Sequence, residues 1–153
     1  MVELIVVVLI VGLLSAVMIP GYNKSVESSK ADDAAAVVLM VGQANRMFRI
    51  DNNNYVDNGT LDDSMNTGNC TAGARNISQL MRCNYLGGRK WTGLPYVYQA
   101  GTSISCGISG APSGIACAKR DSAARSPYDT WGYVMLSNGV LKGYRSGVEI
   151  PLN

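Results

Sequence analysis

An uncharged apolar run near the N-terminus constrains this chain more than any other feature. Residues 4–19 are apolar apart from Gly12 and Ser15, and one carboxylate, Glu3, stands directly before them. As a helix this run would extend about 24 Å, which approaches the ~30 Å hydrocarbon core of a bilayer when the neighbouring turns contribute. Exposure of this much apolar surface to water is unfavourable. The run is therefore expected to need either lipid or other apolar helices around it.

A cleaved signal peptide is the alternative interpretation of this run. Signal peptides carry a positive N-terminal region and a small-residue cleavage pattern, and neither "MVE" nor "MIPGY" supplies these features. The helical pattern also continues beyond the run. We therefore predict one helix from near the N-terminus to about Ile50, ended by the Asn52–Asn54 run because asparagine favours turns. The later part of this helix carries one apolar stripe, formed by Val26, Val37, Val41, Ala44 and Phe48.

The rest of the chain predicts a loop followed by a small antiparallel sheet. Residues 51–88 are rich in turn residues, with a short helix expected near "ISQLMRC". Strand-like segments then alternate with Gly, Pro and Asn: "LPYVYQAG", "TSISCGIS", "GIACAKR", "TWGYVMLS" and "VLKGYRSG". Asn138 and Gly139 in "LSNGVL" predict a hairpin with a two-residue type I′ turn.

This order of elements predicts an α+β fold. Residues 1–22 form the apolar half of the helix, suited to a membrane or a filament core. Residues 23–153 form a globular head, with an amphipathic helix half at 23–50, a loop at 51–88 and the sheet at 89–153. The length of the chain suffices for one modest core in this head.

Four cysteines all lie beyond the apolar run and lack any C-x-x-C spacing, which disfavours a zinc cluster. Of the three possible pairings, closeness in sequence favours Cys70 with Cys83 and Cys106 with Cys117. Each disulfide would contribute roughly 3 kcal/mol by the chain-entropy estimate and would place the head outside the reducing cytoplasm. Reduced, buried thiols are the alternative.

Charge and composition exclude several functions. The chain has no histidine, so His-dependent hydrolysis and His-containing zinc sites are excluded. We find no coherent set of nucleophile, base and orienting group, and therefore expect neither an enzyme nor a bound cofactor or metal. The acidic pairs Asp32–Asp33 and Asp62–Asp63 lack calcium-loop spacing and are expected to be solvated.

Charge is also unevenly distributed along the chain. Eight acids and four bases occur up to Asp63, against three acids and nine bases from Ser64 onward. This asymmetry indicates self-complementary packing or an anionic partner such as DNA, with ordinary solvated charge as the alternative. The candidate basic surface comprises Arg89, Lys90, Lys119, Arg120, Arg125, Lys142 and Arg145. In "SPYDTWGY" we expect a turn with a core Trp131.

The segment "VELIVVVLIVGLLSAVMIP" resembles the N-terminus of type IV pilins and pseudopilins. Glu3, Gly12 and Pro20 stand at the mutual spacing of that family, and the order of long helix, loop, sheet and late cysteines is compatible with it. In processed members an N-methylated Phe lies two positions before the residue that Met1 matches. Either this Phe and the leader before it precede Met1 in the natural protein, or the chain has an engineered or atypical start; N-methylation is implied by the resemblance alone.

The resemblance implies a structural subunit that polymerises through its N-terminal helix. It implies that Glu3 pairs with the N-terminal amine of a neighbouring identical subunit, which would fix axial register because an unpaired carboxylate is costly in hydrocarbon. Gly12 lowers helix propensity by up to about 1 kcal/mol, and Pro20 cannot donate to the carbonyl of Ala16. The segment between them is expected to unwind when subunits leave the inner membrane and enter the filament.

Three functions remain open at this point. The first is the subunit of an extracellular type IV pilus that supports adhesion, motility or DNA uptake, with pilus assembly machinery and possible host-surface or DNA contacts implied by the family. The second is a pseudopilin that forms a periplasmic filament in a type II secretion system. The third is a monomeric binding module held in the membrane by the same helix. Two disulfides and no obvious calcium cluster favour the pilus.

Overall fold

A computed structural model describes residues 2–152 and has the α+β architecture expected from the sequence. One long helix is followed by a loop region and a six-stranded antiparallel sheet. The helices are α1 (Val2–Asn52) and α2 (Gln79–Arg82), with short 3-10 helices η1 (Asp63–Asn66) and η2 (Tyr128–Thr130). The strands are β1 (Gly59–Thr60), β2 (Tyr96–Ile104), β3 (Gly114–Arg120), β4 (Gly132–Met135), β5 (Leu141–Arg145) and β6 (Val148–Ile150).

The chain divides into two compact units, one ending at Asp32 and the other beginning at Asp33. The first unit contains only helix. The second unit, which we call the head, contains the remaining part of α1, the loop region and the whole sheet. The predicted boundary at residue 22 therefore falls inside the first unit.

The sheet of the head is a simple meander in which every strand pairs with its neighbours in the chain. Its order is β1-β2-β3-β4-β5-β6, and all pairs are antiparallel. The register between β2 and β3 shifts between Ala100 and Ile104. Such an irregularity leaves backbone groups without ladder partners, so other groups must satisfy them.

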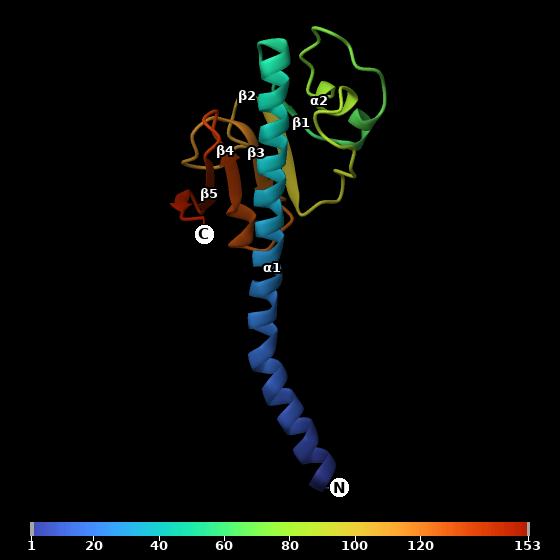
Figure 1. The fold of residues 1–153 in the computed structure, drawn as a ribbon. Coiled ribbons are helices and arrows are strands. Elements are labelled where there is room, and N and C mark those ends of the chain that lie inside the picture. Colours follow the sequence, from blue (N-terminus) through green and yellow to red (C-terminus); the bar gives the residue numbers. More distant parts are fainter. Residues whose placement is uncertain (1, 153) are drawn as a thin grey trace. The chain divides into compact units, whose positions relative to one another are not determined.

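Within the head, α1 packs on one face of this sheet (Figure 1). Gly42 allows the close approach, because a Cβ built there would lie 2.1 Å from Sδ of Met135 in β4. Of the predicted stripe, the helix buries Val37, Val41, Ala44 and Phe48, whereas Val26, in the first unit, is only partly buried. The sheet buries aromatic and small residues against the helix. The buried helix residues include Ala34, Val37, Val38, Val41, Ala44 and Phe48, and the sheet contributes Tyr96, Tyr98, Ala100, Ala116, Ala118, Tyr133 and Met135.

A buried asparagine joins the helix to the irregular part of the sheet. The Asn45 side chain is fully buried, and its amide nitrogen donates to the carbonyls of Gly101 and Ile115, each at 2.9 Å. Its oxygen accepts from the amide of Val56 at 3.1 Å. One side chain therefore satisfies carbonyls on β2 and β3 as well as the chain that leaves α1.

The opposite face of the sheet, which we call the outer face, has a smaller core of its own. The segment between β2 and β3 folds over this face and is tied to β3 by a disulfide. Ile108 of this segment fills the space above Gly132, where a Cβ would lie 2.5 Å from the Ile108 Cδ1 atom. The outer core is formed by Ile104, Ile108, Cys117, Val134 and Tyr144.

The boundaries of several predicted elements differ from the structure. The first predicted strand segment and the start of the second form the single strand β2, whereas residues 105–109 of the second belong to the segment between β2 and β3. The strands β1 and β6 were not predicted. Both of these strands have three residues or fewer, which is too short for period-two alternation to be detected. The helix does end at Asn52, and the predicted short helix near residue 80 is α2.

The predicted hairpin between β4 and β5 is confirmed, but its turn type was wrong. A type I′ turn requires positive φ at both central residues, and of Asn138 and Gly139 only Gly139 has it, at 91°. Leu136 instead bonds Val140 across a three-residue loop, and the Gly139 amide donates back to the Leu136 carbonyl. The Asn138 side chain accepts from the Val140 amide at 3.0 Å, which stabilises this longer loop.

Candidate assembly site

The apolar run forms the first part of α1 and is exposed to solvent. Leu4 is 73% exposed and Ile19 is 58% exposed, and every side chain described between them is also exposed. The helix is long and apolar enough to cross a membrane, a test that a signal sequence near an N-terminus also passes. The run is therefore suited to anchor in a membrane or to serve as a signal sequence.

Glu3 lies in the first turn of α1 and is exposed. The amide groups of a helix N-terminus favour a negative charge at this position. None of the ion pairs found among residues 2–152 involves Glu3.

Gly12 and Pro20 both fall inside α1, which is continuous from Val2 to Asn52. A Cβ built at Gly12 would meet nothing within 4 Å, so close packing inside the chain does not require glycine there. The side chain of Pro20 lies outside the described residues. Nearby, the hydroxyl of Ser15 donates to the Val11 carbonyl at 2.7 Å, which satisfies it within the helix. The predicted unwinding concerns a filament and stays a prediction.

The two disulfides have the pairing that sequence distance favoured. Cys70 bonds Cys83 and closes part of the loop between α1 and β2. Cys106 bonds Cys117 and holds the segment that covers the outer face of the sheet. The two bridges differ in environment, because Cys117 is 1% exposed whereas Cys70 lies on the surface.

The acidic pair at residues 62 and 63 organises the loop region. The Asp62 side chain accepts from the Ser64 amide at 2.8 Å and caps η1. Asp63 accepts hydrogen bonds from the Thr92 hydroxyl and from the amides of Trp91 and Thr92, and these lower the pKa of its carboxyl. Within residues 2–152, no three His, Cys, Asp or Glu side chains gather in a way that could hold a metal ion.

Several bases of the candidate basic surface have separate local partners. Arg89 stacks on Trp91, Arg120 on Tyr96 and Arg145 on Trp131, the last with its guanidinium 3.8 Å from the ring centroid. Another member, Lys142, bonds Glu149 at 2.9 Å, and this pairing raises the pKa of Lys142. Trp131 is buried, as expected for a core residue in the turn that contains it.

Burial on the helix side of the sheet also alters one tyrosine. Tyr98 of β2 is 3% exposed, and burial together with the charge of Asp33 raises the pKa of its hydroxyl to about 12. The tyrosine therefore stays neutral at physiological pH and acts as a core residue.

Sequence reasoning missed two asparagines that stabilise the irregular part of the sheet. Asn45 lies on the same helical face as the predicted stripe, so a polar residue among apolar neighbours was the available signal. The Asn58 side chain accepts from the amides of Thr102 and Ser103, at 2.8 and 3.4 Å. These amides lie where the β2–β3 register shifts, which the sequence does not reveal.

The architecture of a long apolar N-terminal helix, an antiparallel sheet and two disulfides is compatible with a pilin-like fold. Comparisons with protein-family models, with curated proteins and with solved structures find no significant match to this chain.

Proposed function

We propose that this chain is the structural subunit of an extracellular type IV pilus. The observation that carries the proposal is the exposed apolar run of α1 headed by Glu3, joined to a disulfide-linked head. Burial of this run is worth many kcal/mol at about 25 cal/mol per Å² of apolar surface. Polymerisation through a non-closing, heterologous interface buries it when the subunit leaves the membrane.

In this proposal the identical subunit is the main partner and the inner membrane holds the chain before assembly. Glu3 pairs with a cationic group on a neighbouring helix and thereby selects one axial register. The head faces outward, where its disulfides persist in an oxidising environment. Adhesion, motility or DNA uptake would be functions of the assembled filament.

The direct test is electron microscopy of surface material sheared from cells that express the chain. We expect long filaments, with this chain identified in them by mass spectrometry. Protein that stays in the cell envelope in repeated preparations would reject the pilus and favour the secretion pseudopilin or the membrane-anchored module.

A second experiment tests the role of Glu3 separately. Glu3→Ala should reduce filament yield at least about tenfold, because the neutral side chain no longer penalises wrong registers. Glu149→Ala, which removes an exposed acid of the head, is the matched control and should leave filaments unchanged. Both variants should retain two disulfides. Normal filament yield from Glu3→Ala would remove the register argument.

A further inference from the structure

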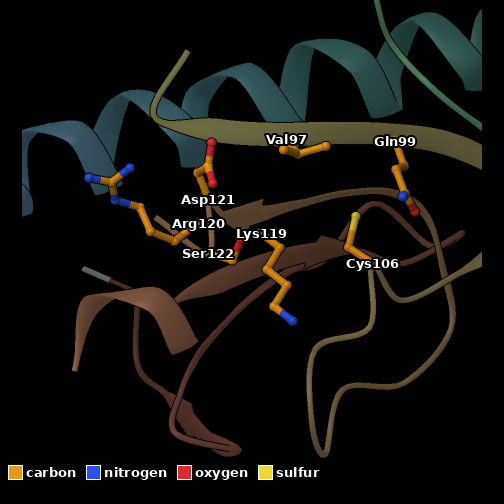
Figure 2. A pocket seen from close by; sticks show the side chains of 7 residues that line it. All are labelled: Val97, Gln99, Cys106, Lys119, Arg120, Asp121 and Ser122. Atoms are coloured by element: carbon orange, nitrogen blue, oxygen red, sulfur yellow. The ribbon is translucent and has the colours of Figure 1, made fainter. Parts of the chain in front are cut away.

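The outer face of the sheet contains a hollow that the filament proposal does not use. Its volume is about 240 Å³, and three chain segments meet around it: the disulfide-linked segment before β3, the 3-10 helix η2 and the turn between β5 and β6. Lys119 of β3 lines this hollow and also the neighbouring one shown in Figure 2. The lining residues are Gly107, Ile108, Ser109, Lys119, Ser122, Asp129, Thr130, Ser146 and Gly147.

The walls of this hollow are held together by the fold. The Cys106–Cys117 disulfide fixes one wall to β3. The hydroxyls of Thr130 and Ser146 lie 3.2 Å apart, and the Ser146 amide donates to Thr130 Oγ1 at 3.1 Å, which joins η2 to the β5–β6 turn. A Cβ built at Gly110 would lie 2.6 Å from the Gly147 carbonyl oxygen, so the first wall also contacts this turn. The hollow is therefore formed before any ligand arrives.

Two opposite charges line the hollow. Oδ1 of Asp129 is buried and accepts no hydrogen bond from any residue between 2 and 152. A buried acceptor without a donor costs free energy, and Asp129 is also one of the residues that line the hollow. Lys119 is half-buried and donates one hydrogen bond, to the Gly107 carbonyl at 3.2 Å. Its ammonium group carries two further N–H donors.

The side-chain directions keep a second cation apart from Lys119. Figure 2 shows Lys119 and Arg120 extending in different directions from β3. Arg120 donates to the Pro95 carbonyl and stacks on Tyr96, which lies on the helix side of the sheet. A ligand on the outer face therefore meets one ammonium group and one carboxylate rather than a basic patch.

We propose that this hollow binds a small zwitterion of the α-amino acid class. The ligand ammonium pairs with the Asp129 carboxylate, and the ligand carboxylate accepts from Lys119 Nζ. Hydroxyls of Ser109, Ser122 and Ser146 offer further hydrogen bonds to a polar ligand. Sites for drug-sized ligands have about 300–1,000 Å³, so the smaller volume here suits an amino acid. This inference is independent of the filament proposal.

The opposite charges argue against two other ligand classes. A metal ion would be repelled by the Lys119 ammonium and would find one carboxylate as its anionic ligand in the lining. A simple anion would leave the Asp129 carboxylate unpaired and would be repelled by it. A ligand that carries both charges satisfies both groups at once.

The test is an NMR titration of the ¹⁵N-labelled full chain in detergent micelles with L-alanine. We expect saturable shifts of the Gly107, Lys119, Asp129 and Ser146 amides below about 10 mM ligand, a range suited to so few ligand atoms. Acetate and methylammonium each carry half of the zwitterion and should bind at least about tenfold more weakly. No saturable shift with L-alanine, or equal binding of either half, would overturn the proposal.

Variants localise the binding. Asp129→Asn and Lys119→Met should each weaken L-alanine binding at least about tenfold, since each removes one charge-assisted hydrogen bond. Ser109→Phe should block the hollow sterically while both charges stay. Asp57→Asn and Lys90→Met, whose side chains lie outside the lining, are the charge-matched controls. If a charge variant fails to fold, the binding of L-alanine to Ser109→Phe and the comparison of L-alanine with acetate and methylammonium still test the proposal. Unchanged binding by Ser109→Phe would contradict the site.

Discussion

The two units of this chain use apolar residues in opposite ways. Up to residue 19 of α1, the apolar side chains that the structure describes are exposed on every side of the helix. From Asp33 onward the same helix alternates buried and exposed positions, with Val38 and Val41 almost fully buried and Asp33 and Gln43 on the surface. One helix therefore contains an apolar segment that is exposed and a segment whose apolar side chains are buried by the rest of the head.

This difference in burial shows which apolar side chains are covered by contacts within the chain. The head encloses a core between helix and sheet and a second core under the disulfide-linked segment. The apolar run has the hydrophobicity of a core but no sheet to cover it. The described side chains of the run are exposed, whereas the stability of the head depends on its own packing.

The largest expected effect comes from removing the apolar run. A chain that begins at Ser25 should be monomeric in detergent-free buffer and should keep both disulfides, because the head has its own core. The full chain should require detergent or form large assemblies under the same conditions. Size-exclusion chromatography with light scattering measures this difference, and aggregation of the shortened chain would contradict the division into two units.

The next effect concerns the buried asparagine of the head. Asn45→Leu should lower the free energy of unfolding by about 4 kcal/mol, because two carbonyls and one amide lose their buried partner. Urea denaturation of the chain that begins at Ser25 measures this loss. Gln43→Leu on the exposed side of the same helix is the matched control and should change stability by about 0.5 kcal/mol or less.

A smaller effect distinguishes the two disulfides. Replacing Cys106 and Cys117 by serine should cost about 3 kcal/mol from chain entropy, plus the burial of a polar group at the position of Cys117. The Cys70–Cys83 bridge closes a loop of similar length but is more exposed. The same replacement there should therefore cost less stability. Thermal unfolding compares the two double variants, and an equal loss would show that burial of the bridge does not matter.

The smallest effect is a pH dependence in the loop region. Hydrogen bonds from Thr92 and Trp91 lower the pKa of Asp63 in the folded chain, so Asp63 stabilises the fold above the ordinary carboxyl pKa. This contribution is lost as the pH falls through the lowered value. Thr92→Val should therefore reduce stability near pH 6 more than near pH 2. A loss of stability that is independent of pH would contradict the role of Asp63.

Much of the fold follows from local patterns. The composition of residues 4–19, the stripe on the later part of α1 and the turn residues at Asn52 predict one long helix with two different halves, as observed. The pairing of cysteines follows from the short loops that the bridges close. The edge strands β1 and β6 could not be predicted, because three residues or fewer carry no measurable period.

Details of the candidate sites depend on contacts between distant segments. Asn45 and Gly101 are 56 positions apart, and only the register shift in β2 explains why an amide is needed there. The Lys119–Asp129 hollow combines three segments that share no sequence pattern. Its formation depends on a disulfide and on a hydrogen bond between Thr130 and Ser146.

The sequence by itself determined that the first part of α1 would be an apolar helix with Glu3 at its start, since hydrophobicity is a property of the residues alone. Only the tertiary structure decided how the core of the head is packed and that Asp129 and Lys119 line one hollow. Burial, register and hydrogen-bond satisfaction are properties of residues brought together by folding, and the free energy of each contact depends on neighbours far away in the chain.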